Sequence, residues 1–124
     1  TDVCVQGAGP HCATPSSFLP LHDLFEYEAA HGTVTRHYYK YLNGEATSTN
    51  PMATIFAWSG ALRKRGELDG IEELQVFADR LERASKETIE AGIMTKDISS
   101  IADLDDKKVV TTEEFLHAVA ERLK

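Results

Sequence analysis

The sequence predicts a mainly helical fold with one short strand near its N-terminal end, and three observations lead to that expectation. Apolar residues recur at helical spacing between Ile71 and Gly92, which is typical of an amphipathic helix. Asn50-Pro51 is a helix-start signal, because Asn caps free N–H groups and Pro has none to satisfy. Thr111 and Glu114 have the spacing of a capping box. The 124 residues have room for one modest core.

The net charge of the chain is −7 and its isoelectric point is near 5.1. A negative field repels phosphate backbones and anionic lipids, which argues against broad binding to nucleic acid or membranes. No apolar run approaches the roughly 20 residues that span a bilayer, and the pattern of a secretory signal is missing. We therefore expect a cytoplasmic location, in which the only two cysteines, Cys4 and Cys12, stay reduced.

Residues 1–24 differ in composition from the rest of the chain. Glycine, proline and serine crowd this segment, which favours a loop-like leader. The alternative is a metal site, but the potential ligands lack the close pairs that structural zinc sites use. These ligands are Cys4, His11, Cys12 and His22. We expect a divergent, loop-like leader over 1–24 and a folded part over 25–124.

Two short elements are expected first after the leader. Residues 24–29 alternate loosely and carry two aromatic side chains, which favours a strand. Residues 34–42 place apolar side chains on one face at helical spacing, and Asn43-Gly44 supplies a stop. That face consists of Val34, Tyr38, Tyr41 and Leu42.

Three longer helices should follow. The first runs from Asn50-Pro51 to Arg65 and ends at Gly66, so that residues 63–65 place three cations near the negative end of the helix dipole. This interpretation is favoured over a nucleic-acid patch on an acidic chain. The second helix covers 71–92, and its charged residues are interpreted as a solvated face. The third begins at Thr111 and repeats apolar residues at helical spacing.

The segment Glu28–Tyr38, together with Ser48–Pro51, combines a glycine turn, hydroxyls, an arginine and a histidine ahead of a helix. Backbone N–H groups around Gly32 can face an anion. The guanidinium of Arg36 suits phosphate oxygens, and His37 can add a hydrogen bond. The alternative is a plain strand-to-helix turn with an exposed arginine. No nucleophile accompanies the histidines, so the pattern indicates ligand binding rather than catalysis.

Five motifs resemble one family, the homodimeric NADP-dependent isocitrate dehydrogenases. They lie in the family's order at 28–38, 47–51, 55–58, 87–92 and 94–97, and the resemblance runs from about Phe25 to Lys124. It implies a mainly helical fragment with a short N-terminal strand, the C-terminal part of an α/β isocitrate/isopropylmalate dehydrogenase-like fold.

The resemblance also implies a coenzyme site. In this family the segment matching 31–37 wraps the adenosine side of NADP, and the pair matching Arg36 and His37 recognises the 2′-phosphate. Asn50 matches an adenine contact, Asp97 is expected in the same pocket, and Glu28 lies toward the nicotinamide end. The implied cofactor-binding residues are Glu28, His31, Gly32, Thr33, Val34, Thr35, Arg36, His37, Asn50 and Asp97.

The family reaction is the tricarboxylic acid cycle step that oxidises isocitrate with NADP and decarboxylates the product to 2-oxoglutarate, with Mg²⁺ or Mn²⁺. The substrate, metal and catalytic residues of the family match no segment of this chain, so it is expected to bind NADP and to be inactive alone. The alternative is a freestanding helical interaction module whose partner surface includes Phe56, Trp58 and Phe77.

Overall fold

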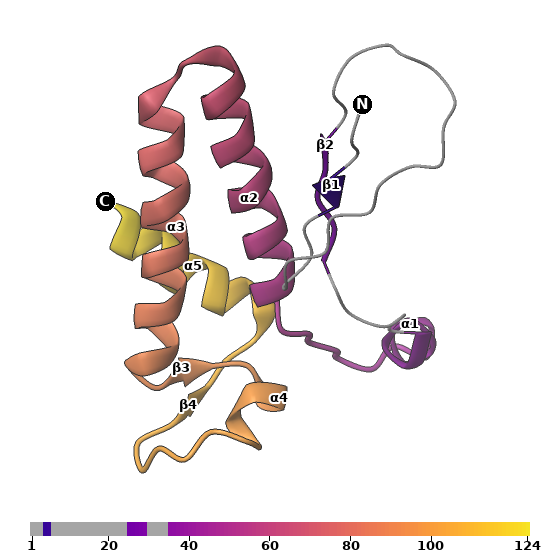
Figure 1. Cartoon of the computed structure of the whole chain (residues 1–124). Coiled ribbons are helices and arrows are strands. Elements are labelled where there is room, and N and C mark those ends of the chain that lie inside the picture. Colours follow the sequence, from indigo (N-terminus) through magenta and orange to yellow (C-terminus); the bar gives the residue numbers. More distant parts are fainter. Residues whose placement is uncertain (1–3, 6–24, 30–34) are drawn as a thin grey trace. The chain divides into compact units, whose positions relative to one another are not determined.

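The computed structural model describes residues 4–5, 25–29 and 35–124 (Figure 1). These residues form two compact units, of which the first holds 4–5, 25–29 and 52–82 and the second holds 35–51 and 83–124. The predicted, mainly helical character is confirmed. The elements are β1 Cys4–Val5, β2 Phe25–Glu26, α1 Thr35–Leu42, α2 Met52–Asp69, α3 Glu72–Glu90, β3 Ile93–Met94, α4 Lys96–Ser99, β4 Lys108–Val109 and α5 Thr112–Leu123. None of the described helices is both long and apolar enough to cross a bilayer.

In the first unit, β1 and β2 form a parallel pair in which Cys4 lies opposite Phe25 and Val5 opposite Glu26. The strand expected over 24–29 is confirmed but shorter. The strand at Cys4–Val5 was not predicted, so the leader is not loop throughout. A two-residue strand has no periodicity of its own, and its partner defines it.

Helix α2 continues past Gly66, where the sequence had predicted its end. Gly66 is buried, and a Cβ at this position would lie 2.8 Å from the Gln75 side chain and 2.8 Å from the Ile71 carbonyl oxygen. Glycine is thus needed for close packing against the start of α3. The helix ends instead at Gly70, whose φ of +68° is the left-handed conformation that glycine adopts readily. The Ile71 amide donates back to the Gly66 carbonyl at 2.9 Å.

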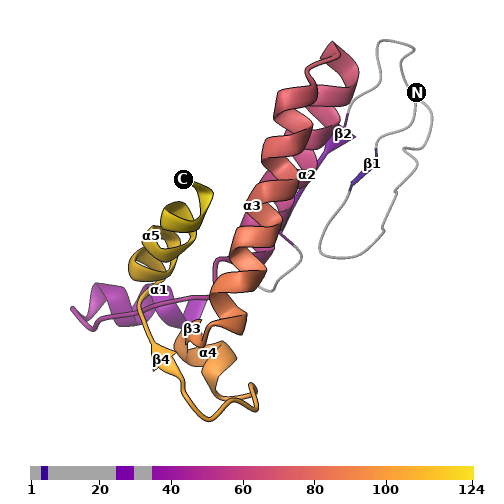
Figure 2. The same ribbon diagram turned by 90° about the vertical axis from the view of Figure 1, so that its left-hand side faces the viewer.

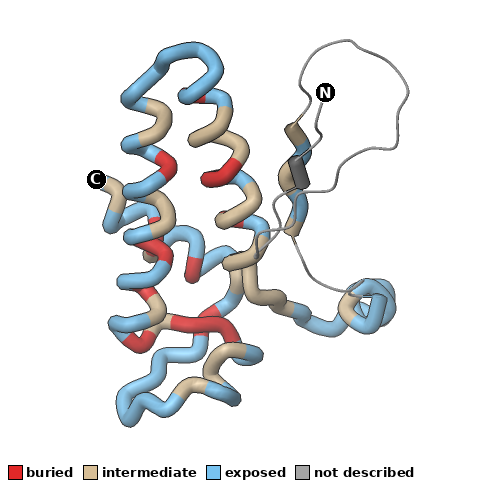
Figure 3. The backbone as a smooth tube through the Cα atoms, viewed as in Figure 1, coloured by how far each residue is buried: buried red, intermediate tan, exposed pale blue. Residues whose placement is uncertain are grey.

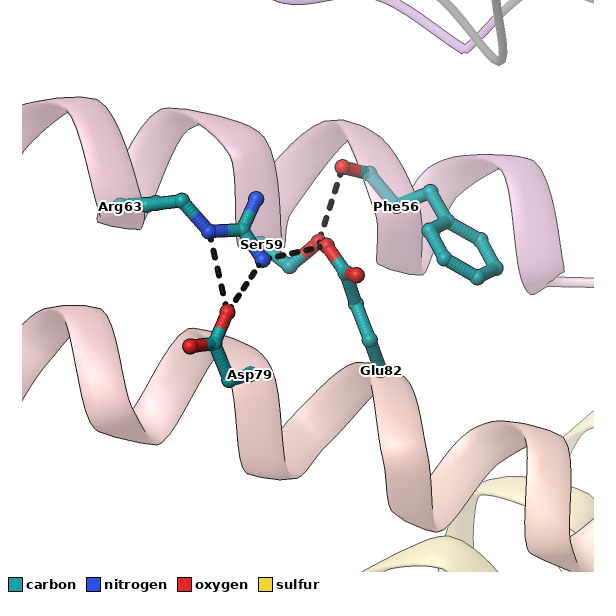
Figure 4. A network of polar contacts seen from close by, with 5 residues as sticks. All are labelled: Phe56, Ser59, Arg63, Asp79 and Glu82. Atoms are coloured by element: carbon teal, nitrogen blue, oxygen red, sulfur yellow. Dashed lines mark hydrogen bonds and ion pairs between the residues drawn. The ribbon is translucent and has the colours of Figure 1, made fainter.

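Helix α2 and the start of α3 form an antiparallel hairpin (Figures 1 and 2) joined by polar contacts (Figure 4). Arg63 Nη2 donates to Asp79 Oδ1 at 2.7 Å and to Glu82 Oε1 at 2.9 Å. The buried Ser59 hydroxyl donates to Glu82 Oε1 at 2.6 Å. The hydrogen bonds that Arg63 donates, first to Glu82 and then to Asp79, raise the pKa of its guanidinium. The network therefore holds the two helices in register.

The predicted position of the basic residues 63–65 at a helix end is wrong, because α2 extends four residues beyond them. Each cation instead pairs with an acid. Lys64 Nζ lies 2.9 Å from Glu67 and also 4.4 Å from the centre of the Phe25 ring. Arg65 lies 2.6 Å from Asp69. These residues therefore have a structural role, although ion pairs rather than the helix dipole provide it.

The second unit contains the end of α3 and a parallel pair of strands that the sequence did not predict. Ile93 of β3 lies opposite Lys108 of β4, and Met94 lies opposite Val109. Gly92, with φ of +82°, ends the predicted 71–92 helix and leads into β3. Buried positions, red in Figure 3, gather around this pair. The buried side chains of the second unit are Ala84, Ser85, Thr88, Met94, Thr95, Val110, Phe115 and Val119.

Helix α1 is confirmed from Thr35 onward, whereas Val34 lies outside the described residues. Its predicted stop is also confirmed. Gly44 has φ of +75°, its amide donates to Tyr41, and the next amide donates to Lys40, both at 3.0 Å. The predicted apolar face is not buried, because Tyr38, Tyr41 and Leu42 are each more than half exposed.

The predicted capping box of α5 is confirmed. The Thr111 amide donates to Glu114 Oε2 at 2.8 Å, and the Glu114 amide donates to Thr111 Oγ1 at 3.2 Å. The hydrogen bond from the Thr111 backbone, followed by that from its side chain, lowers the pKa of the Glu114 carboxyl below its ordinary 4.5.

This lowered pKa predicts a pH-dependent contribution to stability. The Glu114 carboxylate stabilises the folded state above its unfolded pKa, and that contribution is lost as the pH falls through the lowered folded value. We expect Glu114→Gln to be less stable than the wild type at pH 7, with the difference shrinking below pH 4.5. Urea unfolding from pH 7 to pH 3 measures this. Glu113→Gln on the same helical turn is the control, and a Glu114→Gln deficit that stays constant with pH would contradict the expectation.

Candidate anion-binding site

A basic pocket of about 390 Å³ lies within the second unit. Three cationic side chains face it against one carboxylate, and two hydroxyls complete its polar lining. We call it the cationic pocket. Its lining residues are Arg36, His37, Lys40, Ser48, Lys96, Asp97 and Ser100.

Three segments build the cationic pocket. Arg36 and Lys40 are four residues apart on α1 and so lie on one face of that helix. Ser48 belongs to the stretch between α1 and α2. Lys96 and Asp97 form the first turn of α4, directly after β3. The buried Thr95 hydroxyl donates to Asp97 Oδ1 at 2.5 Å and so orients this carboxylate.

His37 carries an unsatisfied polar atom at this site. Its side chain is half-buried, and its Nδ1 is the one buried side-chain nitrogen or oxygen among the described residues without a hydrogen-bond partner. Leaving such an atom unpaired costs about 1–3 kcal/mol. Because His37 lines the cationic pocket, a ligand that hydrogen-bonds this nitrogen would recover that cost.

A second pocket, of about 380 Å³, shares His37, Lys40, Ser48 and Lys96 with the first. Its other lining residues are the apolar Ala46, Val109 and Val110 and the polar Thr47, Thr111 and Glu114. The two pockets together offer positive charge at one end and an apolar surface beside it. A ligand with a phosphate and a flat heterocycle has matching chemistry.

The structure brings three of the predicted site residues together, namely Arg36, His37 and Asp97. Thr35 begins α1 and Asn50 is half-buried, but neither lines a described pocket. Glu28 is exposed and belongs to the first unit. The remaining predicted residues lie outside the described part of the chain: His31, Gly32, Thr33 and Val34. The roles of all these residues toward a coenzyme stay predictions.

Sequence reasoning missed three residues of the cationic pocket, which are Lys40, Lys96 and Ser100, whereas Ser48 belongs to the segment that it had singled out. Lys40 could have been found from its i+4 spacing to Arg36. Lys96 gave no such signal, because it lies far from Arg36 along the chain. Within the described residues there is no group of three or more His, Cys, Asp or Glu side chains that could hold a metal ion together.

The side chains of the alternative interaction module lie on the helical hairpin. Trp58 is 64% exposed and Phe77 is 41% exposed, whereas Phe56 is half-buried. Trp58 also lines a groove of about 350 Å³ in the first unit. Two of the three aromatic side chains are therefore exposed on the hairpin.

Comparison with known proteins decides the family. A family model described as isocitrate/isopropylmalate dehydrogenase matches residues 1–119. The chain belongs to the isocitrate/isopropylmalate dehydrogenase family. This confirms the resemblance and its fold, and it extends the match upstream from Phe25 to residue 1. The leader, expected to depart from the family, therefore lies inside the matched range.

This chain is similar to proteins of fungi and bacteria. The mitochondrial NADP isocitrate dehydrogenase of Saccharomyces cerevisiae is 50% identical over 100% of this chain and 30% of its own length. The mitochondrial NADP isocitrate dehydrogenase of Aspergillus niger is 45% identical over 100% of this chain and 26% of its own length. NADP isocitrate dehydrogenase 1 of Mycobacterium tuberculosis is 50% identical over 80% of this chain and 24% of its own length. The chain thus spans less than a third of each of these relatives.

Proposed function

We propose that this chain is the part of an NADP-dependent isocitrate dehydrogenase that holds the phosphate-bearing end of the coenzyme, and that it is inactive without the rest of the enzyme. The observation that carries the proposal is the cationic pocket, which is lined by Arg36, Lys40 and Lys96 together with His37, whose Nδ1 has no hydrogen-bond partner. The names of the relatives support the choice of NADP.

The residues of the pocket fit the 2′-phosphate, which is the group that distinguishes NADP from NAD. The guanidinium of Arg36 offers paired N–H donors that match phosphate oxygens, and Lys96 adds a second cation. The carboxylate of Asp97 suits hydroxyl or amino donors of the adenosine. The apolar walls at Val109 and Val110 suit the adenine ring. The proposal also retains the roles that the resemblance implies for Asn50 toward the adenine and for Glu28 toward the nicotinamide.

The chemical step belongs to the complete enzyme. NADP supplies the hydride acceptor when bound, and the residues here bind and orient its adenosine end. The ligands of Mg²⁺ or Mn²⁺ and the isocitrate-binding residues are proposed to lie outside this chain, which spans less than a third of the relatives that it matches. A homodimer is proposed for the complete enzyme. The cytoplasmic location also stays a proposal, since relatives are named as mitochondrial and peroxisomal.

Coenzyme titration tests the proposal. We expect the 124-residue chain to bind NADP at least about ten-fold more tightly than NAD, because one charge-assisted hydrogen bond contributes about 1.5–3 kcal/mol. Isothermal calorimetry measures both affinities. Equal affinities, or no binding of NADP, would contradict the proposed site. Turnover of isocitrate by the chain alone, with NADP and Mg²⁺ present, would contradict the proposed inactivity.

A further inference from the structure

Four hydrogen bonds join the first residue of α5 to the segment that precedes α2. Thr112 Oγ1 donates to the Thr49 carbonyl at 2.5 Å and accepts from the Thr49 amide at 3.1 Å. The Thr112 amide donates to Ser48 Oγ at 2.9 Å, and the Ser48 hydroxyl lies 2.9 Å from Thr112 Oγ1. The partners are 63 or 64 residues apart along the chain.

These hydrogen bonds use the backbone amide of Thr112 and every donor and acceptor site of its hydroxyl. At the first position of a helix the backbone amide has no partner inside the helix, so the Thr112 amide is free to bond Ser48. The Thr112 hydroxyl has one proton and two lone pairs, and the contacts to Thr49 and Ser48 use all three. A β-branched side chain also has few χ1 rotamers, so Thr112 holds these bonds at a small entropic cost.

The four hydrogen bonds between Thr112 and the Ser48–Thr49 segment, which we call the clamp, act on a wall of the cationic pocket. Ser48 lines both pockets of the second unit, whereas Thr112 lines neither. The segment 43–51, between α1 and α2, has no helix or strand of its own. Its backbone position beside the pocket therefore depends on contacts such as those from Thr112.

We propose that Thr112 is a positioning residue for coenzyme binding, which fixes the Ser48–Thr49 segment in the conformation that completes the cationic pocket. The proposal rests on the proposed function of that pocket. It links the start of α5 to affinity for the coenzyme, without any contact between Thr112 and the ligand.

Three variants separate this role from a general effect on stability. Thr112→Val keeps the shape of the side chain but removes the hydroxyl, and Thr112→Ser retains the hydroxyl. Val119→Ala opens a cavity in the same helix, where Val119 is buried, and leaves the clamp intact. We expect Thr112→Val to weaken NADP binding about ten-fold, because it removes the three hydrogen bonds of Oγ1 that hold the Ser48–Thr49 segment. Thr112→Ser should restore most of that affinity, and Val119→Ala should lower only the melting temperature.

Amide hydrogen exchange at Thr49, followed by NMR in the 124-residue chain without coenzyme, measures the clamp directly. Faster exchange in Thr112→Val, together with the loss of NADP affinity and its recovery in Thr112→Ser, would support the proposal. Unchanged exchange would overturn it. Faster exchange with unchanged NADP affinity would overturn the positioning role and leave the proposed function standing. Absence of NADP binding by the wild type would overturn the proposed function, and this role with it.

Discussion

Replacing Arg36 with alanine should weaken NADP binding by roughly 10- to 100-fold and change NAD binding little. The cationic pocket places Arg36 beside His37, Lys40 and Lys96, and the guanidinium is the group there that can bond two phosphate oxygens at once. Charge-assisted hydrogen bonds contribute about 1.5–3 kcal/mol each, which corresponds to this range. NAD lacks the 2′-phosphate, so the preference for NADP should largely disappear. Calorimetric titration with both coenzymes measures the change.

Two further variants show whether the effect of Arg36 is local. Arg36→Lys keeps the charge but loses the planar fork, and we expect intermediate affinity for NADP. Arg83→Ala removes the same charge from an exposed position outside both pockets, and we expect a change of less than about two-fold because exposed charges are screened. Equal losses in Arg36→Ala and Arg83→Ala would show that only net charge matters, and would contradict a phosphate contact at Arg36.

The parts of the fold that the sequence predicts are those with local signals. Helix α3 follows from its periodicity, and α5 from the Thr111–Glu114 capping box. The end of α2 was wrongly placed at Gly66, because a glycine that stops a helix and one that packs against another helix look alike in sequence. The segment β3–α4–β4 was missed, since strands of two residues and a helix of four show no period. Long-range pairing defines these elements.

The candidate site was likewise predicted only in part from the sequence. The local pattern around Gly32 singles out Arg36 and His37 as phosphate donors, and the family resemblance adds Asp97. Lys96 joins them only after folding, because β3 carries α4 to the same pocket as α1. The unsatisfied Nδ1 of His37 is a property of three-dimensional packing. A sequence pattern therefore locates the ligand-binding segment but not the complete set of cations around it.

The largest expected loss of stability comes from Phe115→Ala. Phe115 is 0% exposed, and α5, which carries it, packs against β3, where Met94 is also 0% exposed. Removal of a buried aromatic ring costs about 3–5 kcal/mol, because transfer energy is lost and a cavity remains. A domain is stable by about 5–15 kcal/mol in total, so this one change should remove a large part of the stability of the second unit. Urea unfolding followed by circular dichroism measures the loss.

Leu116→Ala is the matched control for the Phe115 substitution. Leu116 is the next residue of α5 but is 43% exposed, so its truncation leaves no closed cavity and should cost less than about 1 kcal/mol. Both substitutions introduce alanine, the best helix former, so the difference between them isolates core packing. Similar losses in the two variants would contradict a core centred on Phe115. Helix α5 also carries Thr112 and Glu114, so the loosening of this helix in Phe115→Ala should release the Ser48–Thr49 wall of the pocket. We therefore expect NADP to raise the unfolding midpoint of this variant less than that of the wild type.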